Sequence, residues 1–231
     1  MIKSLQTSAW MLNLLLLVGM LLSGLMSGMF GQVNLSLVEF FAGLFGQGDV
    51  GITLIVQGLR MPRILLGMLA GATLGYTGAA LQGLLRNPLA DPGVIGVSAS
   101  AGFGAVTAIY LGVAAVSAYA VPLFAMAGAF VATAILMFLA SRDSSVLTLI
   151  LAGIGISSLA TAGVSLMMNF ASSPMSLQDM VMWMLGSLEN RTYDDLMLAG
   201  PLIIGGWLLM VGVGQGLNAL SLGSETAHTL G

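Results

Sequence analysis

Two arginines, Arg60 and Arg63, flank the Met61-Pro62 pair and are the best candidates for functional side chains in this sequence. Residues three apart are neighbours on one face of a helix, so the two guanidinium groups can act together. Proline is tolerated in the first turn of a helix, where its missing N–H has no intrahelical partner, so the motif is expected to open a helix. Guanidinium groups bind carboxylates through paired hydrogen bonds. The pair predicts either a headgroup anchor at a helix end or a cationic socket for carboxylates of an outside partner.

The helices that position these arginines are expected to cross a membrane. Of the 231 residues, 58% are hydrophobic and 6% are charged, six of them Lys or Arg and nine Asp or Glu. Soluble domains carry roughly 25% charged residues, so this chain is a poor candidate for a soluble enzyme, a nucleic-acid binder or a disordered segment. The absence of cysteine excludes disulfides, cysteine-ligated zinc and thiol nucleophiles. The composition indicates an integral membrane protein.

The gaps between charged residues predict six spans, because a transmembrane helix needs ~20 predominantly apolar residues. The gaps are continuously apolar, without the alternation of a barrel strand, and this favours helices. The expected spans are 9–29, one within 63–86, two within 91–142 with a turn near 114–121, 146–169 and 196–213. The predicted fold class is therefore an all-α integral membrane protein, a polytopic bundle of about six transmembrane helices.

The distribution of positive charge does not decide the orientation of these spans. With the N-terminus inside, three basic residues lie on the inner side and three on the outer side, so the positive-inside rule is balanced. The inner residues are Lys3, Arg86 and Arg142, and the outer residues are Arg60, Arg63 and Arg191. Outward arginines in short loops run against the usual bias toward basic residues inside. Their presence favours a partner outside the membrane that binds them.

Two further patterns concern packing and a turn. Gly67, Gly71 and Gly75 form overlapping small-xxx-small steps, the spacing with which helix backbones approach each other in lipid. Residues 87–93 hold two prolines and a glycine, which forbid a continuous helix between the second and third spans. Irregular backbone at a membrane edge is either a bare turn or the kind of segment that a gate or a subunit contact uses.

Missing motifs narrow the classes of function. The sequence contains no Gly-x-x-x-x-Gly-Lys and its one lysine is Lys3, so the chain does not bind ATP through a P-loop. No Asp, Glu or His falls in the middle of a predicted span, which argues against proton- or ion-coupled transport. The one histidine, His228, lies outside the spans. We expect no catalytic residue, no metal site and no cofactor.

Several segments, in this order, resemble the FecCD-type permeases, the membrane subunits of bacterial ABC importers for iron–siderophores, haem and cobalamin. The matching segments are 59–63, 78–82, 87–98, 151–154, 183–188 and 225–227. The resemblance covers essentially the whole chain. It implies a ten-helix permease fold of the type II ABC importers, of which this chain resembles the N-terminal two-thirds: one permease domain, 1–231, incomplete at its C-terminus.

The resemblance also implies roles for particular residues. Arg60 and Arg63 match the outward arginines that dock acidic residues of the binding protein. Asn87 and Leu89 match the cytoplasmic gate, with Ser144 and Ser145 at the second inner loop. Residues 215–231 match the cytoplasmic segment that couples to the ATPase, through Gly223, Ser224, Glu225, Thr226, Ala227, His228 and Gly231. Ser224 and His228 depart from the family, which commonly has an acid and an arginine there, so details of the ATPase contact are expected to differ.

The function implied by the resemblance is a permease subunit, not an enzyme, that moves iron–siderophore complexes by alternating access driven by a partner ATPase. The alternatives are a haem or cobalamin permease, an ATPase-independent secondary carrier, and a non-functional fragment. The implied partners are membrane lipid, a cytoplasmic ATP-binding subunit, a periplasmic or lipoprotein substrate-binding protein, and a second permease in a homodimer or heterodimer; no nucleic acid is expected. The implied location is the bacterial inner membrane, with several spans and the N-terminus in the cytoplasm.

Overall fold

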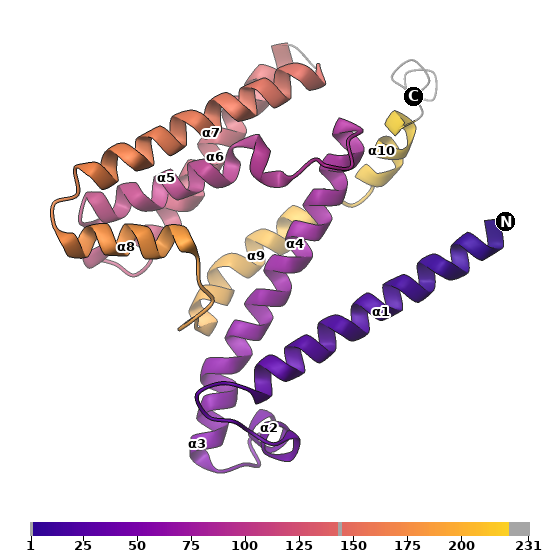
Figure 1. The fold of residues 1–231 in the computed structure, drawn as a ribbon, viewed down its shortest axis with the longest axis vertical. Helices are drawn as coiled ribbons and strands as arrows, with labels where there is room; N and C mark the ends of the chain where they lie inside the picture. The colour runs from indigo at the N-terminus through magenta and orange to yellow at the C-terminus, as the bar shows by residue number, and fades with distance from the viewer. Residues whose placement is uncertain (1, 143–144, 222–231) are drawn as a thin grey trace. The chain divides into compact units, whose positions relative to one another are not determined.

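The computed structural model describes residues 2–142 and 145–221, and within them every regular element is a helix. This confirms the all-α class (Figure 1). The first part contains α1 (Ile2–Met29), α2 (Leu37–Leu44), α3 (Val50–Thr53), the π-helical η1 (Leu54–Arg60) and α4 (Met61–Leu85). The middle contains η2 (Pro92–Ile95), α5 (Val97–Tyr110), η3 (Val113–Ala115), α6 (Ala120–Arg142) and α7 (Val146–Asn169). The last described elements are α8 (Pro174–Leu185), α9 (Tyr193–Leu209) and α10 (Val213–Ser221).

Four helical runs in the described residues are long and apolar enough to cross a membrane: Trp10–Met29, Val50–Leu85, Ala120–Arg142 and Val146–Asn169. A fifth span results if α9 and α10, bent by 52° at a short break, are taken together. The remaining predicted span corresponds to α5, whose 14 residues extend only ~21 Å at 1.5 Å per residue, against a hydrocarbon core of ~30 Å. The membrane class is confirmed, and the number six stays a prediction.

The second span begins earlier than the sequence predicts, because η1 joins α3 to α4 in one run of 36 residues. Within an α-helix, the ring of Pro62 would clash with the carbonyl four residues earlier. Here the preceding turn is widened: the N–H of Met61 donates to the carbonyl of Val56, five residues back, as in a π-helix. The helix α4 does begin at Met61, within the motif, as expected. Arg60 and Arg63 nevertheless lie inside a continuous helical run that starts at Val50, so the expectation that the motif opens the second span is wrong.

The chain forms two compact units. The first comprises residues 1–73 and 188–211, and the second comprises 74–187 and 212–231. The first unit has a core of Leu35, Phe40 and Val56, contributed by the loop before α2, by α2 and by η1. The first turn of α2 is fixed by a capping box, in which the Ser36 hydroxyl accepts from the Glu39 N–H while the Glu39 carboxylate accepts from the Ser36 N–H.

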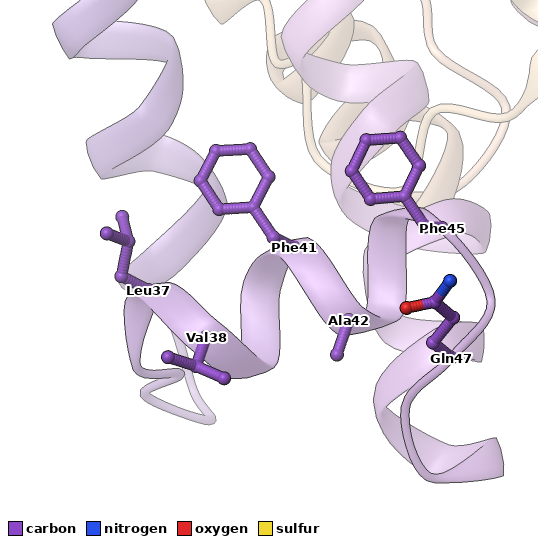
Figure 2. A pocket seen from close by; sticks show the side chains of 6 residues that line it. All are labelled: Leu37, Val38, Phe41, Ala42, Phe45 and Gln47. Atoms are coloured by element: carbon purple, nitrogen blue, oxygen red, sulfur yellow. The ribbon is translucent and has the colours of Figure 1, made fainter.

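The opposite face of α2 is apolar and exposed (Figure 2). Phe41 and Phe45 project from the same side of the helix with their rings stacked, 6.5 Å between centroids. They line a shallow hollow of about 360 Å³ together with Leu37, Val38, Ala42 and Gln47. The buried face of α2 thus holds the core of the first unit, and its other face is exposed among the residues that the structure describes.

The second unit is built around α5, which packs against α6, α7 and α8 (Figure 1). The contact of α5 with α6 is made through backbone: a Cβ added at Gly104 would lie 2.1 Å from the carbonyl oxygen of Phe124, and one at Gly128 would lie 2.2 Å from that of Ser100. A core of Val106, Ile109, Val164 and Met180 joins α5 to α7 and α8. Small residues at four-residue spacing on α5, namely Ser100, Gly104 and Ala108, make this approach possible.

Candidate functional site

The Arg60 side chain is buried, with 9% of its surface exposed. Its guanidinium donates from Nη1 to the carbonyl of Gly28 at 2.5 Å, and from Nη2 to the carbonyl of Val33. Gly28 belongs to the last turn of α1, where carbonyls have no intrahelical partner. A cation at a helix C-terminus is also favoured by the helix dipole. Arg60 therefore caps α1 and holds the following loop, and does not simply project outward.

Arg63 is exposed and lies on the rim of a groove of about 300 Å³ in the first unit. The groove is formed by the end of α1 and its following loop, by η1 and the start of α4, and by the turn before α9. Its lining residues are Ser27, Phe30, Gly31, Gln32, Val33, Ile55, Leu59, Arg60, Arg63, Glu189 and Asn190. The structure thus brings the two predicted arginines to one groove but gives them different environments.

Sequence reasoning missed Glu189 and Asn190 as members of this groove. They lie more than 120 positions after Arg63, and no local pattern connects the two segments. Asn190 has a φ of 56°, a left-handed conformation in which asparagine is enriched, and this sharp turn places the pair at the groove. The charged residues that line the groove are Arg60, Arg63 and Glu189. The groove therefore carries mixed charge, with an excess of positive charge that a carboxylate entering it would meet.

Arg191, the third arginine predicted to face outward, lies next to this turn and forms an ion pair with Asp195, 3.7 Å apart, one turn along the chain. Asp195 also accepts from the Thr192 N–H, as the capping box of α9. An exposed ion pair of this kind contributes only roughly 0.2–1 kcal/mol. We assign the Arg191 side chain to the start of α9, and Arg63 is the exposed cation at the groove.

The predicted gate residues Asn87 and Leu89 lie in the loop between α4 and η2, in the second unit. The Asn87 side-chain carbonyl accepts from the Leu89 N–H at 2.9 Å, an Asx turn. Arg86 before it has a φ of 50°, which ends α4 abruptly. This turn leaves the Leu89 side chain 86% exposed. The loop is therefore locally ordered, yet it offers an apolar side chain to its surroundings.

The far end of this loop is anchored on α7. The Asp91 carboxylate accepts from the Gly93 N–H at 2.7 Å and caps η2. Gly96 then takes a φ of 83°, and a Cβ added there would lie 2.8 Å from the carbonyl of Gly153. This close approach ties the segment that follows the Asn87–Leu89 loop to the N-terminal half of α7.

Ser145, a further predicted gate residue, caps the start of the same helix: its hydroxyl accepts from the Thr148 N–H at 3.1 Å. Ser144 lies outside the described residues, as do the coupling residues Gly223, Ser224, Glu225, Thr226, Ala227, His228 and Gly231. Of the predicted coupling segment, residues 215–221 form most of α10, where Leu217 lies 3.5 Å from a Cβ added at Gly83 of α4.

The predicted packing glycines differ in their surroundings. A Cβ added at Gly67 would lie 3.3 Å from the side chain of Leu188, whereas one added at Gly71 or Gly75 would meet nothing within 4 Å in the described part of the chain. Packing at Gly71 and Gly75 stays a prediction.

The sequence from residue 15 to residue 231 matches the model of the FecCD transport family. The chain is 36% identical over 196 residues to the ABC transporter permease protein YvrB of Bacillus subtilis (strain 168), covering 83% of this chain and 55% of that protein. It is also 36% identical over 225 residues to the vitamin B12 import system permease protein BtuC of Salmonella paratyphi A, covering 96% of this chain and 65% of that protein.

A solved structure, a metal-chelate type ABC transporter in an inward-facing conformation, matches with a TM-score of 0.79 and 28% identity, over 91% of this chain and 64% of that one. An all-helical chain with several membrane-length helices and a match along nearly all its length defines the class as a membrane permease. The chain belongs to the FecCD transport family. It spans between about half and two-thirds of the length of the two curated relatives described above.

Proposed function

We propose that this chain serves as the transmembrane subunit of a binding-protein-dependent ABC importer. The observation that carries the proposal is the match of residues 15–231 to the model of the FecCD transport family. The groove at Arg63 adds a physical reason, because an exposed guanidinium beside a half-open groove suits an acidic side chain of an outside protein. Such contacts steer association more than they hold it.

The proposed cycle is alternating access. A loaded substrate-binding protein docks on the outer face at the groove of Arg60 and Arg63, and ATP binding to a cytoplasmic partner moves the coupling segment. That movement opens or closes the gate at Asn87 and Leu89 as a rigid-body change between packed helices. In this scheme energy comes from the partner chain, which agrees with a sequence that lacks a P-loop and mid-span acids.

The proposed cargo is a chelated metal. One relative is named for vitamin B12 import and the matching structure for a metal-chelate transporter. Within that class we propose an iron–siderophore complex, with cobalamin and haem as alternatives. The proposed setting is the bacterial inner membrane, with the N-terminus in the cytoplasm and the permease working as a homodimer or heterodimer in membrane lipid.

Uptake by proteoliposomes tests this proposal. The permease is reconstituted with the proposed ATP-binding subunit and substrate-binding protein, and uptake of radiolabelled ferric siderophore, vitamin B12 and haem is compared. ATP-dependent uptake of one cargo that also requires the binding protein supports the proposal and identifies the cargo. Uptake driven by an ion gradient without ATP supports the secondary carrier, and no uptake with every partner present supports a non-transporting fragment.

A further inference from the structure

The geometry points to different tasks for the two arginines of the outer groove: Arg60 is a positioning residue that builds the groove, and Arg63 makes the contact. Both residues lie on one helical run, yet one is buried and the other exposed. This inference deepens the proposed function, because the contact role of Arg63 rests on docking of the substrate-binding protein at this groove. The positioning role stands on hydrogen bonds within this chain alone.

The first step concerns what the Arg60 guanidinium binds. It donates to the carbonyls of Gly28 and Val33, on either side of the turn that ends α1. Both acceptors are backbone atoms, so no side chain of a partner is needed to satisfy this cation. A planar fork with several fixed donors can bridge two carbonyls, whereas a lysine ammonium is a compact point charge on a flexible stem. The site therefore requires the shape of arginine and not only its charge.

The second step concerns how the surroundings admit the guanidinium. A Cβ added at Gly31 would lie 3.2 Å from Nη2 of Arg60, tighter than ordinary contact, so a glycine at this position gives the side chain room. The backbone of Gly31 is outside the left-handed region, so alanine there would crowd Arg60 without straining the backbone. A backbone hydrogen bond also closes this loop: the Leu35 N–H donates to the Met29 carbonyl at 2.9 Å.

The third step links this clamp to the groove. Gly31, Gln32 and Val33 form one wall of the groove that carries Arg63. Arg60 fixes this wall to the helical run from which Arg63 projects. Loss of the clamp is thus expected to loosen the wall, while loss of Arg63 removes a cation and leaves the wall in place.

Hydrogen–deuterium exchange of the full chain in lipid nanodiscs tests this inference. The variants are Arg60→Lys, which keeps the charge, Arg60→Gln, which removes it, and Arg63→Lys as the matched control. Losing a hydrogen bond to a charged group is expected to raise the population of molecules with the 30–35 loop detached by about tenfold or more. Amide exchange in the 30–35 segment should rise by the same factor in both Arg60 variants. Exchange there should not change in Arg63→Lys, nor at the 111–118 connection in any variant.

Wild-type exchange at 30–35 in Arg60→Lys would overturn the inference, because charge alone would then suffice. If an Arg60 variant loosens the 111–118 segment as well, Gly31→Ala decides: faster exchange confined to 30–35 supports the clamp, and unchanged exchange overturns it. None of these readouts needs a binding protein or transport, so failure of the proposed function would leave this test intact. If the clamp is confirmed but Arg63→Glu docks the binding protein as well as wild type, only the docking proposal fails.

Discussion

Nη1 of Arg60 donates to the carbonyl oxygen of Gly28, a residue 32 positions earlier in the chain. The bond ties the last turn of α1 to the end of η1, three residues before the exposed Arg63. A buried cation whose donors are used by backbone carbonyls and a neighbouring cation on the surface are expected to respond differently to the same substitution. That difference underlies the predictions for the groove of Arg60 and Arg63.

Arg63→Ala is expected to weaken binding of the substrate-binding protein by about 1.4- to 5-fold, the range for one exposed ion pair. The loss arises because the carboxylate of the partner regains water and loses one surface charge contact. Fluorescence titration of the reconstituted permease with labelled binding protein measures this Kd. High salt should bring wild type close to the variant, since exposed pairs are screened. Equal affinities of the two proteins at low salt would contradict the contact role of Arg63.

Gly104→Ala is expected to destabilise the helical domain by about 1–3 kcal/mol, the usual cost of overpacking. The added Cβ would lie 2.1 Å from the carbonyl oxygen of Phe124, and backbone cannot yield there without separating α5 from α6. Thermal unfolding in detergent, followed by tryptophan fluorescence, measures the change. Gly155→Ala on α7 is the matched control, because nothing lies within 4 Å of its added Cβ. A Gly104 variant as stable as that control would argue against the close α5–α6 contact.

The stability of the α2 segment is expected to fall at acid pH because of Glu39. Hydrogen bonds from the Ser36 side chain and backbone lower the pKa of the Glu39 carboxyl from its ordinary value of 4.5. A carboxyl with a lower pKa in the folded state stabilises that state above its unfolded pKa, and this stability is lost as pH falls through the folded value. Unfolding midpoints between pH 3 and 7 should therefore drop less steeply in Ser36→Ala than in wild type. Parallel curves would show that the capping box does not hold the carboxylate.

Cysteine scanning is expected to place the two loops on opposite sides of the membrane. The chain has no cysteine, so Gln32→Cys and Leu89→Cys each introduce one thiol. With the N-terminus in the cytoplasm, position 32 follows the first span and lies outside, while position 89 follows the second and lies inside. A membrane-impermeant maleimide should label 32 in intact cells and 89 only in inverted vesicles. The reverse pattern would place the groove of Arg63 inside and end its proposed docking role.

Much of the architecture could be predicted because charge is expensive in a hydrocarbon core, so uncharged gaps mark helices. The α1 and α7 helices end at residues 29 and 169 as predicted, and α6 lies within the predicted 91–142 stretch. The early start of the second run could not be predicted, since it depends on a π-turn before Pro62 that no spacing announces. The α5–α6 contact had a visible signal in the four-residue spacing of Ser100, Gly104 and Ala108, whereas attention to the clearest glycine repeat led to Gly71 and Gly75, whose faces are open in the described residues.

The groove of Arg60 and Arg63 shows the limit of spacing arguments. That Arg60 and Arg63 share a helix and a groove follows from their separation and was predictable. That Arg60 is buried depends on carbonyls 27 and 32 positions away, and that Glu189 joins the groove depends on a turn far along the chain. Such partners are set by tertiary packing, which a single sequence does not display.

The most direct test of the central claim is ATP hydrolysis by the reconstituted full-length permease and its ATP-binding subunit, with and without the substrate-binding protein. We expect the binding protein to stimulate hydrolysis in wild type. We expect Arg63→Glu to keep its basal rate but to show weaker stimulation at sub-saturating concentrations of the binding protein, because a reversed charge repels the acidic side chain of the partner. Stimulation of Arg63→Glu equal to that of wild type would contradict docking at this groove.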